Sequence, residues 1–324
     1  MSALSLGVDD ALAELRDLPT DRSTAWFFPG QGAQAVGMGA DLFEEFPIAR
    51  ATFEYADNIL GFNLSELCFS GPSEKLMQTE FTQPALVVHS IAALLASWKS
   101  GIVTNKAGVI AGHSLGEYAA LIVSGACSFS DGIRLVRKRG QLMQEACDNS
   151  QGTMAAILGL EVEHVEKICS ESGAHLCNVN APGNITIGGT TSSVKIANDL
   201  AASQGASKVV PLTVAGAFHT PLMQSAAEGM ETVLNETSFR ELEIDVISNV
   251  TGVIIPEAKF ISHELHAQIT QPVRWLDGVL EMVQQGVTNV IEFGPGRVLT
   301  GAAKRTNRDL ILRNIGKSED FISS

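Results

Sequence analysis

Basic side chains are scarce in this sequence. Its 324 residues carry 22 Lys and Arg against 36 Asp and Glu, which gives a formal net charge of −14. Proteins that bind nucleic acid normally present an excess of basic residues, so this balance argues against a nucleic-acid partner. The same charge repels anionic ligands at long range, so any anionic ligand needs a local cluster of cations.

Cysteines are few, and no hydrophobic run is long enough to span a bilayer. The five cysteines are odd in number and fit no zinc motif, so we expect reduced, buried thiols and a cytoplasmic location. The acidic N-terminus fits neither a signal nor a transit peptide. The longest apolar run, residues 85–98, is interrupted by His89 and Ser90 and falls short of the ~20 residues of a membrane helix. We interpret it as a buried helix with Pro84 at its first position, and expect no membrane partner.

Alternating strand and helix patterns predict an α/β fold. Residues 1–22 are expected to form an N-terminal leader, and residues 23–150 and 216–324 to form a core. Residues 151–215 read as β-α-β-β-α-β, which predicts an inserted ferredoxin-like subdomain. The alternative is that this segment continues the main sheet.

The predicted elements of the core can be set out by residue range. Its strands are expected at 24–28, 108–111, 244–248 and 289–293. Its helices are expected at 41–60, 84–98, from 116, 221–234 and 275–285.

The strongest local signal is Gly112-His113-Ser114-Leu115-Gly116, which matches G-x-S-x-G. An apolar strand precedes it and a helical pattern follows it, as in a nucleophile elbow. The glycines leave room for a tight turn, and the helix N-terminus offers N–H groups to a developing oxyanion. Ser114 is therefore the candidate nucleophile, although an ordinary glycine-rich turn with a capping serine has the same pattern.

A serine nucleophile needs a base, and His219 is the best placed of the seven histidines. It lies between a β-rich run and Pro221, at a junction where α/β folds often place catalytic groups. His164 lies in a charged helix and reads as a solvated side chain. No acid that could orient the histidine is evident, because none of the aspartates between Ser114 and His219 follows an apolar strand.

Several motifs together resemble the malonyl-CoA:acyl carrier protein transacylases. The resemblance covers about residues 23–315 in one order, nearly the whole chain. It implies an α/β-hydrolase-like core that holds the serine and a ferredoxin-like subdomain across the cleft. The motifs are Phe28-Pro29-Gly30-Gln31-Gly32, Gly112 to Leu121, Arg139-Gly140 with Met143-Gln144-Glu145, Asn180-x-Pro182-Gly183, Gly216-Ala217-Phe218-His219, Gln271-Pro272-Val273-Arg274-Trp275 and Gly294-Pro295-Gly296.

The resemblance also implies roles for individual residues. Ser114 is the nucleophile and His219 the base, oriented by the main-chain carbonyl of Gln268. The main-chain N–H groups of Gln31 and Leu115 form the oxyanion hole. Arg139 binds the malonyl carboxylate, a task suited to a planar, permanently charged fork. Without the resemblance, Arg139 would read as an exposed cation at a helix end.

Further substrate contacts follow from the same resemblance. Met143 and Asn180 fall in its motifs, and Lys208 and Lys304 match positions that contact coenzyme A or the carrier. With Arg297 and Arg305, these lysines are expected to form a basic mouth. In related modular polyketide acyltransferases, Phe at the position of Phe218 accompanies selectivity for malonyl over methylmalonyl groups. Gln at the position of Leu115 would suggest the branched unit, so Leu115 matches the malonyl pattern too. The alternative for Phe218 is a packing role only. The family often has Asn where this chain has Gln271, which puts a side-chain role there in doubt.

The function implied is transfer of a malonyl group from malonyl-CoA, through a seryl ester, to the phosphopantetheine thiol of acyl carrier protein. It needs no metal or redox cofactor, because the coenzyme A thioester is a substrate. A trans-acting polyketide synthase acyltransferase has the same chemistry. A thioester hydrolase of this fold would be expected to lack the carboxylate-binding Arg139, and a catalytically silent carrier-binding module would not need Ser114 and His219.

Overall fold

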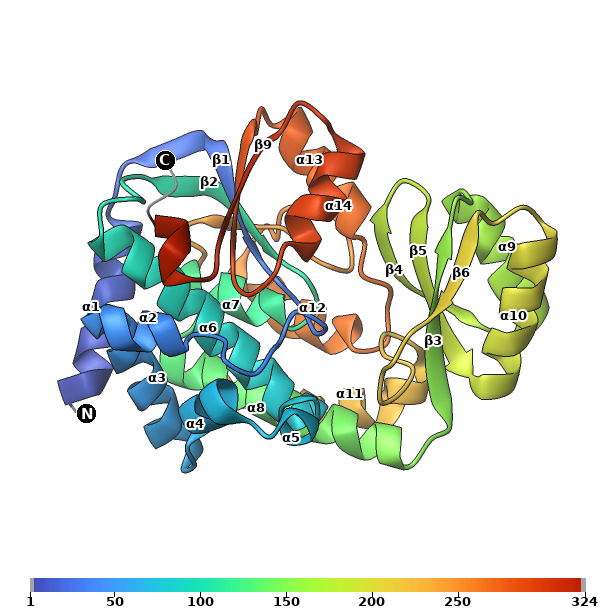
Figure 1. The fold of residues 1–324 in the computed structure, drawn as a ribbon, viewed down its shortest axis with the longest axis horizontal. Helices are drawn as coiled ribbons and strands as arrows, with labels where there is room; N and C mark the ends of the chain where they lie inside the picture. Colours follow the sequence, from blue (N-terminus) through green and yellow to red (C-terminus); the bar gives the residue numbers. More distant parts are fainter. Residues whose placement is uncertain (1–2, 322–324) are drawn as a thin grey trace.

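Two sheets organise the chain, one parallel and one antiparallel (Figure 1). The computed structural model describes residues 3–321. The parallel sheet has the strand order β7-β2-β1-β8-β9, and the antiparallel sheet has the order β4-β5-β3-β6. This confirms the predicted fold class and excludes continuation of the main sheet through residues 151–215. The strands are β1 (Thr20–Phe28), β2 (Lys106–Gly112), β3 (Gly152–Leu158), β4 (His175–Ala181), β5 (Asn184–Thr190), β6 (Lys208–Pro211), β7 (Asp245–Val246), β8 (Asn289–Phe293) and β9 (Ile311–Ile315).

Strand β1 is the central strand of the parallel sheet. Trp26, Phe27 and Phe28 are fully buried, as expected for a strand covered on both faces. Phe28 pairs with Gly112 at the end of β2, and β8 runs parallel to β1 on its other side. Since parallel strands end at one edge, the loops after β1, β2 and β8 meet there.

Helices cover both faces of this sheet. We call the parallel sheet with its helices the larger part of the chain, and the antiparallel sheet with its two helices the smaller part. Those of the larger part are α1 (Ala3–Arg16), α2 (Ala40–Glu45), α3 (Pro47–Leu60), α4 (Leu64–Ser70), α5 (Ser73–Leu76), α6 (Thr79–Lys99), α7 (Gly116–Val123), α8 (Phe129–Asp148), α11 (Gln224–Glu236), α12 (Ile261–Gln268), α13 (Trp275–Gln284) and α14 (Val298–Thr306). Short 3₁₀ turns span Pro221–Met223, Ala258–Phe260 and Ser318–Phe321.

The predicted start of the long apolar helix is wrong. Helix α6 begins at Thr79, so Pro84 lies inside it instead of at its first position. Proline has no N–H to donate to the carbonyl of Glu80, and Arg137 of α8 donates to that oxygen instead. By length and composition α6 could cross a membrane, but nearly all of it is buried in the fold, as in the core helix of a globular protein.

Three other elements also differ from the prediction by more than a residue or two. The expected helix at 41–60 is two helices, because Pro47 forces Phe46 into an extended conformation (φ −118°, ψ 114°). Strand β1 begins at Thr20, four residues before the predicted start. Strand β7 is only two residues long, because the chain then turns into the loop that holds Asn249.

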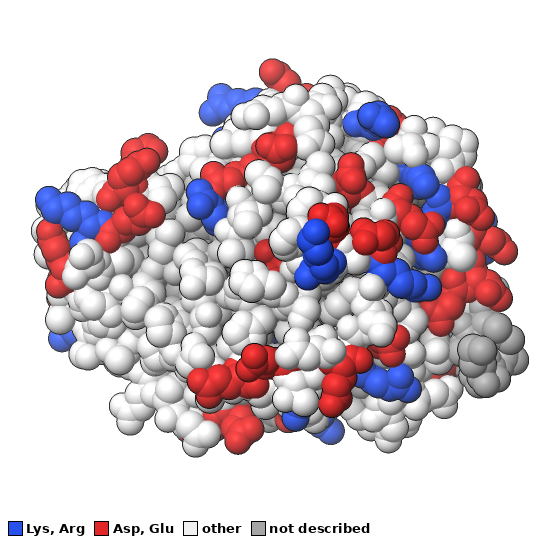
Figure 2. All heavy atoms as spheres, turned by 180° about the vertical axis from the view of Figure 1, so that it is seen from behind, with Lys and Arg blue, Asp and Glu red and all other residues white. Residues whose placement is uncertain are grey.

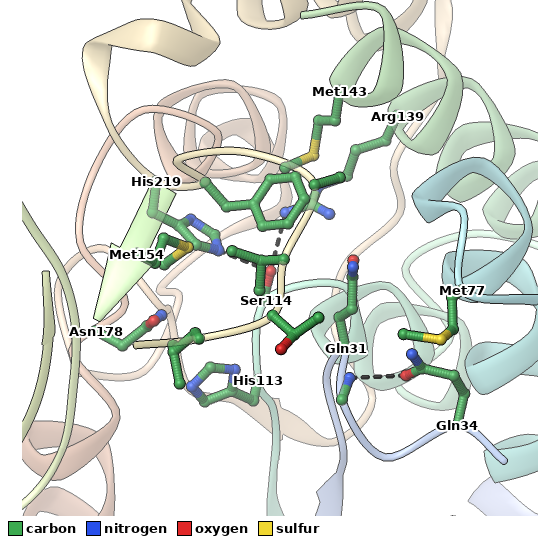
Figure 3. Close-up of a pocket in the computed structure, with 16 residues that line it drawn as sticks. Gln31, Gln34, Met77, His113, Ser114, Arg139, Met143, Met154, Asn178 and His219 are labelled. Carbon is green, nitrogen blue, oxygen red and sulfur yellow. Dashed lines mark hydrogen bonds between the residues drawn. The ribbon is translucent and has the colours of Figure 1, made fainter. Parts of the chain in front are cut away.

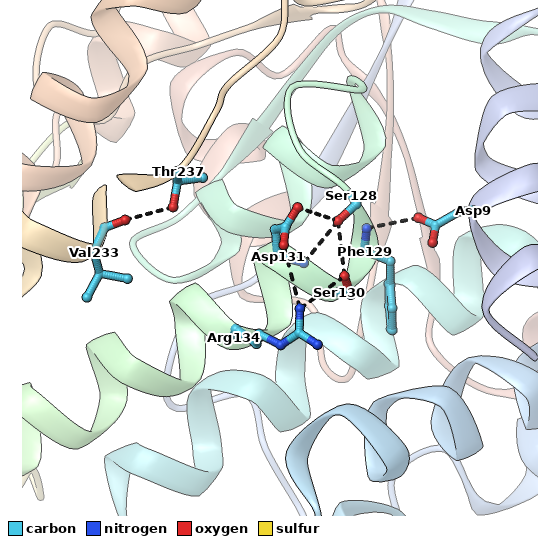
Figure 4. Close-up of polar contacts among 8 residues, drawn as sticks. All are labelled: Asp9, Ser128, Phe129, Ser130, Asp131, Arg134, Val233 and Thr237. Atoms are coloured by element: carbon cyan, nitrogen blue, oxygen red, sulfur yellow. Dashed lines mark hydrogen bonds and ion pairs between the residues drawn. The ribbon is translucent and has the colours of Figure 1, made fainter. Parts of the chain in front are cut away.

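Helix α1 lies within the predicted leader, residues 1–22, and packs against α3 and α6. The Asp9 carboxylate accepts the N–H of Phe129 at 3.0 Å, at the first residue of α8 (Figure 4). The Ser128 side chain caps the same helix by accepting the N–H of Asp131 at 3.1 Å. These contacts help to fix the helix that carries Arg139.

The antiparallel sheet carries α9 (Val162–Ser172) and α10 (Thr191–Ser203) on one face. Its other face is turned toward the larger part, as Figure 1 shows on the right. A short parallel bridge joins the parts: Val179 donates to Val273 at 2.9 Å, and Val273 donates to Cys177 at 2.8 Å. This bridge holds β4 beside the loop that precedes α13, over the carboxyl edge of the parallel sheet.

Candidate active site

Ser114 lies on a turn between β2 and α7 that only small neighbours allow. Its φ is 52°, in the left-handed region that non-glycine residues rarely occupy. A Cβ on Gly112 would overlap the main-chain carbonyl of Gly116, and one on Gly116 would overlap the main-chain oxygen of Phe28. The two glycines are therefore required by close packing of the turn.

Asn249 clamps this turn from the loop after β7. Its Oδ1 accepts the N–H of Ser114 at 2.7 Å, and its Nδ2 donates to the carbonyl of Gly112 at 2.7 Å. Its own N–H donates to the carboxylate of Glu117 at 3.1 Å. Sequence analysis missed Asn249, because no motif marks it and its partners lie more than 130 positions earlier in the chain.

The structure brings Ser114, His219 and Gln268 into one chain of hydrogen bonds. Ser114 Oγ lies 2.8 Å from His219 Nε2, and His219 Nδ1 lies 2.7 Å from the main-chain oxygen of Gln268. The carbonyl can only accept, so Nδ1 carries the proton and Nε2 is free to take one from the serine. Burial, and then the positive charge of Arg139, lower the pKa of His219 to about 3.

Arg139 extends from α8 to the same serine. Its Nη2 lies 3.1 Å from Ser114 Oγ and 2.7 Å from Gln268 Oε1, and its Nη1 lies 2.7 Å from Gln83 Oε1. The side chain is buried, and no carboxylate in the described part of the chain forms an ion pair with it. A buried cation whose bonded acceptors are all neutral is suited to bind an anionic group beside the nucleophile.

Two main-chain N–H groups near Ser114 have no protein acceptor within residues 3–321. They belong to Gln31, after β1, and Leu115, at the start of α7. The side chain of Gln31 is held by Thr79, whose hydroxyl donates to Gln31 Oε1 at 2.8 Å. Unpaired donors beside a nucleophile are the arrangement that stabilises an oxyanion.

A cavity of about 400 Å³ opens above the serine (Figure 3). Of the predicted substrate residues, Met143 and Phe218 line it, together with Met77 and Met154. A second cavity of about 480 Å³ shares four residues with the first, so the two lie side by side. The shared residues are Gln31, His113, Asn178 and Leu212.

Only some of the other predicted substrate-binding residues line the second cavity. Asn180 lines it and its Oδ1 lies 3.0 Å from Nε2 of His113. Arg297 and Arg305 also line it. Lys304 is not one of its lining residues, since its ammonium donates to the main-chain oxygens of Arg308 and Leu310.

Lys208 is exposed at the first position of β6 and lines neither cavity. The next residue of the strand, Val209, packs against the core formed with α9 and α10, so Lys208 points to the opposite side of the sheet, toward the larger part. On the face opposite to that of Figure 1, acidic and basic side chains are mixed and form no continuous basic patch (Figure 2).

These features define a class: an α/β enzyme that forms a covalent acyl-serine and binds an anionic group on its substrate. The acyl transferase domain family matches residues 25–320. The malonyl CoA-acyl carrier protein transacylase of Bacillus subtilis is 43% identical over 291 residues, which cover 88% of this chain and 91% of that protein.

Solved structures agree with this match. An acyl carrier protein S-malonyltransferase from Vibrio cholerae is 40% identical with a TM-score of 0.88, and the match covers 92% of this chain and 98% of that one. A malonyl-transacylase solved in complex with a type II polyketide synthase acyl carrier protein is 38% identical with a TM-score of 0.89, covering 93% and 98%. The chain belongs to the acyl transferase domain family and, within it, to the malonyl-CoA:acyl carrier protein transacylases.

Proposed function

We propose that this chain is a soluble, cytoplasmic enzyme that transfers a malonyl group from malonyl-CoA to the phosphopantetheine thiol of acyl carrier protein, in fatty acid or polyketide synthesis. The observation that carries the proposal is the buried guanidinium of Arg139, 3.1 Å from Ser114 Oγ and without a carboxylate partner in the described chain. A malonyl group supplies that carboxylate on the acyl chain. The names of the relatives support the same donor and acceptor.

The transfer proceeds in two half-reactions. His219 Nε2 takes the proton of Ser114, whose oxygen attacks the thioester carbonyl, and the N–H groups of Gln31 and Leu115 stabilise the oxyanion. Coenzyme A leaves with the proton from His219, and a malonyl-serine ester remains. The carrier thiol then gives its proton to His219 and attacks the ester, and the serine oxygen leaves with the proton from His219, which regenerates the free enzyme.

The remaining predicted residues have supporting roles in this proposal. Met143 and Phe218 contact the acyl group, and Asn180 contacts the pantetheine side of the substrate. Lys208, with the arginines of the second cavity, attracts the anionic coenzyme A and carrier; Lys304 contributes by fixing the end of α14.

We also propose that residues 151–215 form a subdomain that closes the cleft over the serine. The core is then made of residues 23–150 and 216–324, and residues 1–22 are an added leader whose helix α1 braces α8. The last residues of this leader, 20–22, begin β1 and so join the parallel sheet of the core. The separate antiparallel sheet and the contacts of α1 support this division.

Intact-protein mass spectrometry tests the function. After mixing with malonyl-CoA, the enzyme should gain one malonyl group, and addition of phosphopantetheinylated carrier should move that group to the carrier. Absence of the adduct would indicate a silent binding module. Loss of the adduct to water at the same rate with and without carrier would indicate a hydrolase.

The rate of enzyme acylation should not fall at the pH where an exposed histidine titrates. His219 acts as a base only when it is neutral, and its pKa is lowered to about 3, so the rate should stay constant down to about pH 5. The unfolded chain takes up this proton near pH ~6.5, so the fold loses stability as pH falls from there toward the folded pKa. Rapid-quench acylation, with circular dichroism at each pH, makes the measurement. A midpoint near pH ~6.5 in folded protein would contradict the environment assigned to His219.

Phe218→Ser should raise methylmalonyl transfer relative to malonyl transfer. Phe218 lines the cavity beside the nucleophile and is nearly buried, so its ring limits the space at the acyl α-carbon. One methyl group is worth about 1–3 kcal/mol in such a pocket, so the product ratio should shift by roughly 5- to 150-fold. Competition between the two thioesters, read from product masses, gives the ratio. An unchanged ratio in an active variant would leave Phe218 a packing role only.

A further inference from the structure

Glu117 is a buried carboxylate directly beneath the nucleophile turn. It is fully buried in the first turn of α7, three residues after Ser114, and no basic side chain in the described chain pairs with it. Burial raises its pKa, and the nearby negative charge of Glu264 raises it further. A carboxyl in such a place is costly unless its hydrogen bonds are satisfied.

Both carboxylate oxygens of Glu117 receive a hydrogen bond from a residue that contacts the reaction centre. Oε1 accepts the main-chain N–H of Asn249 at 3.1 Å, and Asn249 holds the N–H of Ser114. Oε2 accepts Nε2 of Gln268. Glu117 therefore connects the nucleophile turn with the residue that orients His219.

The amide of Gln268 is oriented by what surrounds it. Its Nε2 also donates to the main-chain oxygen of Ser114 at 2.9 Å, and its Oε1 accepts Nη2 of Arg139 at 2.7 Å. The two ends of an amide have nearly the same shape, so only the donors and acceptors around it decide which end faces Arg139. The acceptors at Glu117 and Ser114 hold the nitrogen away from the guanidinium.

We propose that Glu117 is a positioning residue for the malonyl carboxylate: it fixes the Gln268 amide so that a carbonyl oxygen, instead of an NH₂ group, faces Arg139. If the Gln268 amide turned over, its NH₂ group would face the N–H groups of Arg139. Two donors would then oppose each other, and the guanidinium would move away from its present position beside Gln268 and Ser114. The inference rests on the proposed malonyl transfer. It predicts a change in selectivity among acyl groups more than a change in the reactivity of Ser114, because a neutral acyl group does not bind Arg139.

Glu117→Gln is the discriminating variant, because it has the same shape and changes only the hydrogen-bond pattern. Its single carbonyl oxygen can accept from Asn249, and its NH₂ group then faces Nε2 of Gln268 and favours turning that amide over. A buried donor left without its acceptor corresponds to a loss of roughly 10- to 100-fold. We expect kcat/KM for malonyl-CoA to fall by that factor, mainly through KM, while acetyl-CoA transfer changes by less than about threefold.

Glu292→Gln is the matched control. Glu292 is a buried carboxyl of β8 that accepts the N–H of Thr300 at 2.8 Å and its hydroxyl at 2.9 Å, and none of its bonds within the described chain reaches Glu117 or Gln268. Its ratio of malonyl to acetyl transfer should stay within about threefold of wild type, since no hydrogen bond to Arg139 depends on it.

A double-mutant cycle with Gln268→Ala completes the test. Alanine keeps the main-chain carbonyl that holds His219 and removes the amide, so it should reduce malonyl selectivity by itself, and Glu117→Gln should reduce it no further in that background. Equal losses with both thioesters in Glu117→Gln, or additive losses in the double variant, would overturn the proposal. If Glu117→Gln is too unstable to assay, unchanged selectivity in Gln268→Ala overturns it. Failure of the function itself would appear separately, as a wild-type enzyme that gains no malonyl group.

Discussion

Ser114→Ala is expected to abolish the malonyl-enzyme adduct and to reduce transfer to the carrier by ~10⁴-fold or more. Ser114 Oγ is the only nucleophilic atom in the described chain within hydrogen-bond distance of His219 Nε2, at 2.8 Å. Alanine fits the left-handed turn no worse than serine, and Asn249 still bonds the N–H of residue 114 and the carbonyl of Gly112. The loss therefore reports on the hydroxyl and not on the turn. Mass spectrometry of the intact enzyme after exposure to malonyl-CoA measures the adduct directly.

Two further variants make this result specific. Ser97→Ala removes a buried hydroxyl from α6 whose one hydrogen bond within residues 3–321 goes to the carbonyl of Ala93, and it should leave labelling intact. His219→Ala should slow labelling by orders of magnitude while the serine remains available. A Ser114→Ala protein that still acquired one malonyl group at the wild-type rate would place the nucleophile elsewhere.

Local chain patterns predicted those parts of the site that are contiguous in sequence. The nucleophile turn needs glycines at 112 and 116 because its backbone leaves no room for side chains, and that requirement is written in one pentapeptide. Strand and helix periodicity likewise predicted the separate antiparallel unit, since β3 to β6 follow one another along the chain. Such features depend on short-range geometry, which sequence patterns record well.

The hydrogen-bond partners around the serine could not be predicted in this way. Asn249 and Gln83 lie in no motif, and the motif that contains Glu117 predicted no role for it. The hydrogen bonds that show what these residues do join segments far apart in the chain. The carbonyl of Gln268 belongs to the same group: residues alone gave no orienting partner for His219, and only the family resemblance pointed to it. The predicted position of Pro84 in its helix was wrong for a related reason. The side chain of Arg137, far along the chain, donates the hydrogen bond that the proline cannot donate.

Arg139→Ala is expected to remove the preference for malonyl over acetyl groups. The guanidinium is buried, and in the described chain it bonds Gln83, Gln268 and the serine. No other Lys or Arg of residues 3–321 lines the cavity, so no second cation there can take its place. A malonyl carboxylate in the variant would be buried without a partner, at a cost of about 2–5 kcal/mol, or roughly 30- to 4,000-fold in kcat/KM. An acetyl group has no carboxylate and escapes this cost. Competition between malonyl-CoA and acetyl-CoA, read from the mass of the acylated carrier, measures the ratio.

The acetyl reaction is also the internal check on this variant. Removing Arg139 leaves the amide oxygens of Gln83 and Gln268 without their donor, which lowers stability whatever the role of the charge. Retained acetyl transfer would show that the fold and the serine–histidine pair are intact, so that a change in the malonyl-to-acetyl ratio reports on the role of Arg139.

Arg134→Ala, an exposed position of the same helix, should leave the ratio unchanged. Arg139→Lys should fall between, because a lysine keeps the charge but cannot form the two parallel bonds of the guanidinium. Full malonyl preference in Arg139→Ala would mean that another group holds the carboxylate and that Arg139 serves only to pack α8 against the site.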